Sequence, residues 1–148
     1  MDDEARIEGF IEKFTDELAD QIRGARAEMR RRLPDAFELV YDNYNALAIG
    51  YGFTEKTGQA VFSLACFPRR VSLVFIRGVE IDDPQGLLHG EGNQVRYIPL
   101  ADLAVLDHPA VRDLWDQAIS HASRPLQPTP GRTIVKSVSA KQRPRRPA

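Results

Sequence analysis

A stretch near the middle of the chain decides the fold: residues 60–76 read AVFSLACFPRRVSLVFI. Two mostly apolar runs, 60–67 and 71–76, are separated by the turn sequence Pro68-Arg69-Arg70. Short apolar runs on either side of a turn predict a β-hairpin. Because these runs contain so few polar residues, we expect central strands with little water on either face.

Further strands are predicted on both sides of this hairpin. Residues 37–41 alternate and end at a turn, 46–53 alternate more sharply, and 95–100 return to a strand after the irregular segment 78–94. One side of strand 46–53 carries only small residues, namely Ala46, Ala48, Gly50 and Gly52. Such a side lets another group approach the backbone closely, most often a packed helix and less often a ligand.

Helices are predicted at both ends of the strand block. Residues 4–14 place apolar side chains at helical spacing, and a second helix begins after the N-cap residue Thr15 and ends near Arg32, before Pro34. A third helix is expected over 108–122, with Asp107 as its N-cap. The order predicts an α+β two-layer sandwich, with a mainly antiparallel sheet and the N- and C-terminal helices packed on one face.

Composition limits the class of protein. The chain has 148 residues, 43% of them hydrophobic, which suits one globular domain. Its single cysteine, Cys66, excludes an internal disulfide framework, and its three histidines lack zinc-type spacing. No apolar run approaches the roughly 20 residues that span a bilayer, and the acidic start of the chain does not resemble a signal peptide. We therefore expect a cytoplasmic protein without a membrane partner.

Charge is distributed unevenly along the chain. Residues 124–148 carry a net charge of +7, and the rest of the chain carries −8. We assign 1–123 to a single domain, and 124–148 to a proline-rich linker, an extra strand over 132–138 and a basic disordered tail. The tail is interpreted as solvated, as docked on its own acidic body, or as bound to a polyanion. For sequence-blind nucleic-acid binding, the candidates are Lys141, Arg143, Arg145 and Arg146.

No catalytic residues can be assigned, but two candidate binding sites stand out. Polar groups at a strand end and an arginine after a glycine-rich loop could together line a pocket for a small anion; these are Tyr41, Tyr44, Asn45, Gly90, Gly92 and Arg96. Alternatively, Tyr41, Tyr44 and Asn45 belong to a hairpin corner, and Gly90, Gly92 and Arg96 belong to a structural loop. The carboxylates Glu4, Glu8 and Glu12 recur every four residues, so they form either a weak site for hard cations or a solvated helix face.

Several segments together resemble the YdhG-like family, a bacterial domain of unknown function. They are Ile11 to Phe14, Leu33-Pro34, Glu38 to Leu47, Val71 to Gly78, Asp83-Pro84, Leu87 to Gly92 and Val95-Arg96. The resemblance covers roughly residues 7–122 and implies a frataxin-like α+β fold. In one branch it also implies an iron chaperone, whose acidic residues would map to Glu4, Glu8 and Glu12.

Three functions follow from these observations. The first is a small, non-enzymatic binding domain, with iron as the most concrete ligand. The second is a nucleic-acid-associated protein that uses the basic tail. The third is a small-molecule pocket, or an unrecognised enzyme, around Arg96. A homodimer stays open, because an uncovered sheet edge would invite one.

Overall fold

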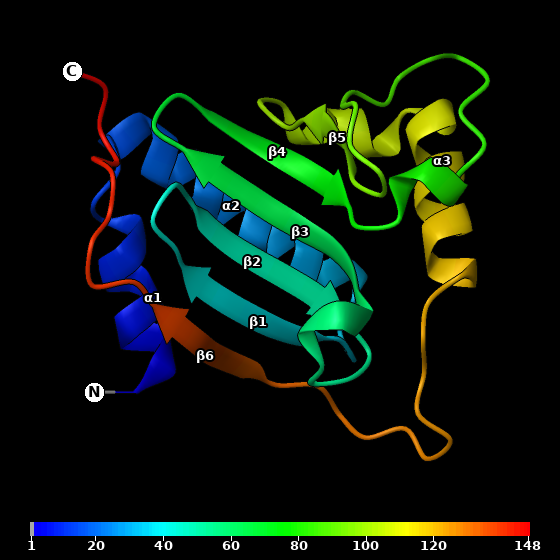
Figure 1. Cartoon of the computed structure of the whole chain (residues 1–148), viewed down its shortest axis with the longest axis horizontal. Helices are drawn as coiled ribbons and strands as arrows, with labels where there is room; N and C mark the ends of the chain where they lie inside the picture. Colours follow the sequence, from blue (N-terminus) through cyan, green and yellow to red (C-terminus); the bar gives the residue numbers. More distant parts are fainter. Residues whose placement is uncertain (1) are drawn as a thin grey trace.

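A six-stranded sheet forms the centre of the structure, a computed structural model that describes residues 2–148. The strands are β1 (Phe37–Asp42), β2 (Leu47–Gly52), β3 (Ala60–Phe67), β4 (Arg70–Phe75), β5 (Arg96–Pro99) and β6 (Thr133–Val138). They lie in the order β5-β4-β3-β2-β1-β6 (Figure 1). The predicted central hairpin is confirmed, since β3 and β4 pair antiparallel. The other neighbours are also antiparallel except β1 and β6, so the sheet is mixed and mainly antiparallel.

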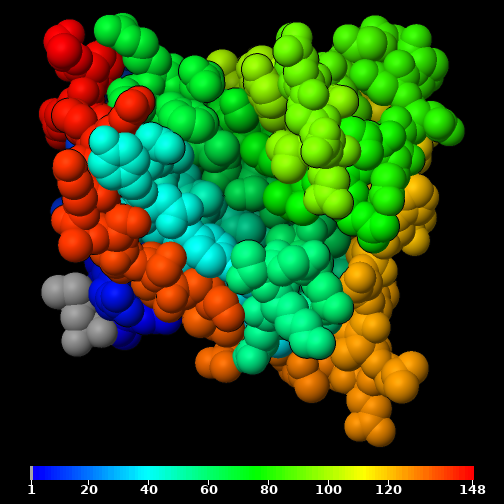
Figure 2. Space-filling model, viewed as in Figure 1, coloured from blue at the N-terminus to red at the C-terminus, as the bar shows by residue number. Residues whose placement is uncertain are grey.

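The C-terminal part of the chain belongs to this sheet. The predicted extra strand is present as β6, which lies at the sheet edge and pairs in parallel with β1. Residues 139–148 differ from the disordered tail that the sequence predicts. They run along one edge of the molecule (Figure 2, red), and Arg145 is only 4% exposed. The fold therefore extends well past residue 123, where the sequence interpretation ends the domain.

Within residues 2–148, three helices and three short 3-10 turns complete the fold. They are α1 (Asp3–Ile11), α2 (Asp16–Arg32), η1 (Thr57–Gln59), η2 (Gly78–Glu80), η3 (Leu103–Asp107) and α3 (Pro109–Ser120). Thr15 caps α2 as predicted, because its hydroxyl accepts a hydrogen bond from the Leu18 N–H. Asp107, in contrast, does not cap α3. It ends η3 and pairs with Arg32, and the side chain of His108 accepts the capping hydrogen bond instead.

One buried hydrophobic cluster contains side chains from both the helices and the strands. Helical side chains such as Ile7, Ile22 and Leu114 belong to the same buried cluster as the strand residues Ile49 and Leu64. Figure 1 shows α2 running behind the strands. No helix in the described part of the chain is long and apolar enough to cross a membrane.

The small-residue side of β2 is not the side that packs on helices. The large side chains Leu47, Ile49 and Tyr51 enter the core, so the alternating small residues face the other side of the sheet. Burial of the larger side chains removes more apolar area from water, which explains this orientation. At Gly52 a backbone does approach closely: a Cβ there would lie 2.9 Å from the carbonyl oxygen of Gln59. The close neighbour is therefore the η1–β3 junction.

Candidate functional site

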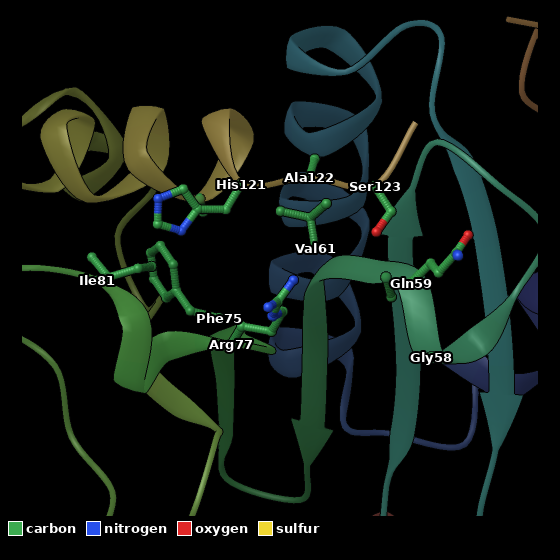
Figure 3. Close-up of a pocket in the computed structure, with 11 residues that line it drawn as sticks. Gly58, Gln59, Val61, Phe75, Arg77, Ile81, His121, Ala122 and Ser123 are labelled. Carbon is green, nitrogen blue, oxygen red and sulfur yellow. The ribbon is translucent and has the colours of Figure 1, made fainter. Parts of the chain in front are cut away.

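A pocket lies between the adjoining ends of β3 and β4 and the C-terminal end of α3 (Figure 3). Its cavity volume is about 40 Å³, room for a few water molecules and well below the roughly 300–1,000 Å³ typical of small-molecule sites, so a ligand would be held mainly at its open mouth. Its apolar wall is formed by Val61, Phe75, Ile81 and Ala118. Three segments that are distant in sequence thus meet around one apolar hollow.

Polar and cationic groups are placed at the mouth of this pocket. Arg77, His121 and Ser123 line it, and Figure 3 shows the His121 ring beside Phe75 and the Arg77 side chain directed toward Val61. A Glu80 carboxylate oxygen holds the Arg77 guanidinium at 2.8 Å. His121 is fixed at the end of α3, because its backbone N–H donates to carbonyls of the last helical turn. The arrangement can hold a ligand with an apolar body and a negatively charged end.

Aromatic side chains of the core pack behind Phe75, which lines the pocket. The Phe62 ring stacks on Trp115, with ring centroids 4.2 Å apart, and meets Phe75 edge to face at 5.5 Å. Trp115 is the only tryptophan of the chain. Its fluorescence therefore reports on this end of the molecule.

The structure does not assemble the pocket predicted around Arg96. Arg96 begins β5, whereas Tyr41 lies on β1, and three strands separate them. The Arg96 guanidinium donates to the Gly92 and Val95 carbonyl oxygens, both at 2.7 Å, so it closes its own loop. Gly90 adopts a left-handed φ of 117° within that loop.

The companion residues of that prediction form a hairpin corner. Tyr44 and Asn45 are exposed in the β1–β2 turn, and the hydroxyl of Tyr41 bonds to the side chain of Thr57. The glycine-rich stretch and the tyrosine-rich turn are therefore separate structural features, because the strand order places β5 at one edge of the sheet and β1 next to the other edge.

The acidic residues of α1 are largely engaged with arginines of α2. Arg26 donates two hydrogen bonds to Glu4, at 2.8 and 3.1 Å, and these bonds lower the pKa of the Glu4 carboxyl. Glu8 pairs with Arg23, and Glu12 lies exposed at the C-cap of α1. Within residues 2–148, no three or more His, Cys, Asp or Glu side chains gather as a metal site would require. Any hard cation would have to displace these arginines.

A buried carboxylate that sequence inspection did not single out connects α2, the sheet and β6. Glu38 on β1 is 3% exposed and accepts hydrogen bonds from Arg26, Tyr51 and Thr133. Burial, together with the adjacent Glu38 carboxylate, raises the pKa of the Tyr51 hydroxyl. These contacts satisfy the buried charge, so the cluster serves the fold.

A second buried carboxylate anchors the basic tail. Asp42 at the end of β1 is fully buried, and it pairs with Arg145 at 3.0 Å and with Lys13 at 2.8 Å. Arg145 also donates to the backbone carbonyls of Asn43 and Tyr44. Of the four predicted nucleic-acid residues, this one is buried while Lys141, Arg143 and Arg146 stay exposed. The tail is docked on its own chain, one of the three interpretations that the charge distribution allows.

Comparison of the chain with protein-family models, curated proteins and solved structures found no match. The function must therefore be argued from the geometry. Sequence inspection missed the pocket, because Arg77 and His121 are 44 positions apart and neither lies in a recognisable motif. The one signal in the sequence was that Arg77 directly follows the apolar run 71–76, which places a charged group at the end of a strand.

Proposed function

We propose that this protein is a small ligand-binding domain whose site is the pocket between β3, β4 and α3. The observation that carries the proposal is that Arg77 and His121 both line a pocket whose wall includes Phe75 and Val61. The ligand class that fits is a small organic anion, namely a carboxylate attached to a short apolar chain. Binding alone, without catalysis, is sufficient to account for this arrangement.

The chemistry of the pocket supports this ligand class. A carboxylate can accept hydrogen bonds from the Arg77 guanidinium and the His121 imidazole, and the Ser123 hydroxyl offers a further donor. Phe75 is already fully buried, so a short apolar chain would lie at the mouth against the small exposed part of Val61, gaining about 0.8 kcal/mol for each methylene group that it buries. An uncharged amide of the same length would keep the apolar term but lose the charge-assisted hydrogen bonds.

Membership in the YdhG-like, frataxin-like class is part of the same proposal. What supports it is the α+β order and a core cluster that contains residues of α1, α2 and α3 together with strand residues. That cluster is compatible with N- and C-terminal helices on one sheet face. In this proposal the bound ligand lies at the α3 end of the sheet, away from the carboxylates Glu4 and Glu8 on α1.

The experiment is a titration of the full chain with straight-chain carboxylates from acetate to octanoate, read by Trp115 fluorescence and by thermal shift. A ligand that binds only the folded state raises the melting temperature by mass action. We expect affinity to rise only over the first few members of the series, because the cavity volume is about 40 Å³, and the matched amides to bind at least tenfold more weakly.

Variants connect that titration to the pocket. Arg77→Gln and His121→Gln should each weaken carboxylate binding by about tenfold, the loss that corresponds to one charge-assisted hydrogen bond. The matched control is Arg112→Gln, which removes an exposed arginine of α3 that does not line the pocket. Equal affinity of Arg77→Gln and the unmodified protein, or no response to any carboxylate, would show the proposal to be wrong.

A further inference from the structure

The C-terminal segment, residues 133–146, is held by contacts with the first 44 residues of the chain. Thr133 donates to Glu38, and the Val135 N–H donates to the Asp3 carboxylate at 3.2 Å. Gln142 and Arg145 then bond to residues at the β1–β2 turn. The surface along β1 therefore recognises an extended segment, through a main-chain ladder with side-chain contacts at both ends.

The most specific of these contacts is a socket for a guanidinium group. Asp42 and the carbonyl oxygens of Asn43 and Tyr44 surround the Arg145 side chain, which is 2% exposed. The fit is incomplete, however, because the Nε of Arg145 is buried without a hydrogen-bond partner. An unsatisfied buried donor lowers the stability of the closed state and makes the segment easier to release.

The connection between α3 and β6 contributes neither a helix nor a strand. Residues 121–132 contain Pro125, Pro128 and Pro130, and the side chain of Leu126 is fully exposed. Figure 1 shows this connection running along the end of the sheet, from α3 to the far edge. Residues 121–132 therefore act as a tether. The contacts that hold residues 133–146 can form whether the segment comes from the same chain or from a second copy.

We infer that the β1 edge and its Asp42 socket also accept the C-terminal segment of a second copy of this chain, giving an exchanged dimer. Charge favours this partner, because residues 124–148 carry +7 and the remainder of the chain carries −8. In such a dimer each Asp42 pairs with Arg145 of the other copy, and β6 extends the partner's sheet. The inference is independent of the ligand proposed for the α3 pocket.

Shortening the tether tests the inference. Deletion of residues 125–129 leaves seven of the twelve residues between α3 and β6, which shortens the fully extended reach of the connection by about 17 Å. The segment should then fail to close on its own body and should pair between copies. We expect size-exclusion chromatography with light scattering to give twice the chain mass, with the β-sheet signal in circular dichroism retained.

Variants in the shortened chain identify the socket. Arg145→Ala should raise the dimer dissociation constant at least tenfold, whereas Lys141→Ala, which removes an exposed charge from the same segment, should leave it unchanged. Mixing Asp42→Ala with Arg145→Ala chains should restore dimer, since one socket of the mixed pair is complete. A shortened chain that stays monomeric, folded or unfolded, overturns the inference. So does a dimer that is insensitive to Arg145→Ala.

Discussion

Two buried carboxylates on one strand are the residues on which the most contacts converge. Glu38 and Asp42 lie four positions apart on β1 and face the helical side, where each is neutralised by an arginine from another element. A buried pair is weak evidence of net stabilisation, but removing one partner leaves an uncompensated buried charge. Single substitutions at these positions should therefore be far more damaging than substitutions in exposed ion pairs.

The first prediction concerns Glu38. Glu38→Ala strands the Arg26 guanidinium and the Tyr51 hydroxyl, so it should lower the free energy of unfolding by about 3–5 kcal/mol. The control is Glu8→Ala, which breaks the half-exposed pair with Arg23 and should cost less than about 1 kcal/mol. Urea denaturation followed by Trp115 fluorescence measures both. Similar losses in the two variants would mean that the Glu38 cluster is not a sealed, low-dielectric site.

At the level of elements, β6 covers the edge of the sheet beside β1, and Asp3 in turn occupies a backbone donor of β6. It covers β1, and the side chain of Asp3 accepts the Val135 N–H, which occupies one donor that could pair with another sheet. The entry to β6 is tight: a Cβ on Gly131 would lie 2.1 Å from the Ala36 carbonyl oxygen. Backbone cannot move aside as a flexible side chain can, so this position requires glycine.

The second prediction follows from that contact. Gly131→Ala should displace the start of β6 and lower the free energy of unfolding by about 1–3 kcal/mol, the usual effect of overpacking. Gly58→Ala is the matched control, because no neighbouring atom lies within 4 Å of its added Cβ. Hydrogen exchange of the β6 amides would locate the loss. Unchanged protection of β6 in Gly131→Ala would contradict the close approach.

Local elements could be predicted from the sequence, and the contacts between distant segments could not. Helical spacing of apolar residues predicted α2, and two apolar runs on either side of a turn predicted the β3–β4 hairpin. The socket joins Asp42 to a residue 103 positions away, and tail composition alone suggested disorder. The α3 cap was predicted one residue too early, because Asp107 is a preferred N-cap residue type and His108 is not. The pocket depends wholly on where the sheet brings Arg77 and His121.

At the scale of the whole molecule, opposite charges divide between the body and the C-terminal segment, and their pairing closes the fold. Asp42 is the point of closure. Burial alone would raise the pKa of its carboxyl, but hydrogen bonds from Lys13 and Arg145 overcome burial and hold that pKa below its usual value. The Arg26 hydrogen bonds lower the pKa of Glu4 in the same way. Both carboxylates are thus more acidic in the folded state than in the unfolded state.

The third prediction is an acid-dependent loss of stability that starts at the tail. Groups with a lowered folded pKa add stability above their unfolded pKa of about 4, and this stability is lost as the pH falls through the folded values. The free energy of unfolding should therefore stay high from pH 7 to about pH 5 and decrease below about pH 4. Urea titrations over this range, followed by Trp115 fluorescence, measure the curve.

Substitution of Asp42 tests how much of that pH dependence comes from its carboxylate. Asp42→Asn should lower stability by about 3 kcal/mol at pH 7, because Lys13 and Arg145 lose their buried counter-charge. The difference from the unmodified protein should shrink as acid protonates Asp42, and hydrogen exchange should show residues 139–148 opening first. Asp116→Asn, at an exposed position of α3, should leave the curve unchanged. If the Asp42→Asn curve ran parallel to that of the unmodified protein down to pH 3, the closure would not depend on the Asp42 charge. The exchanged dimer would then lose its electrostatic basis as well.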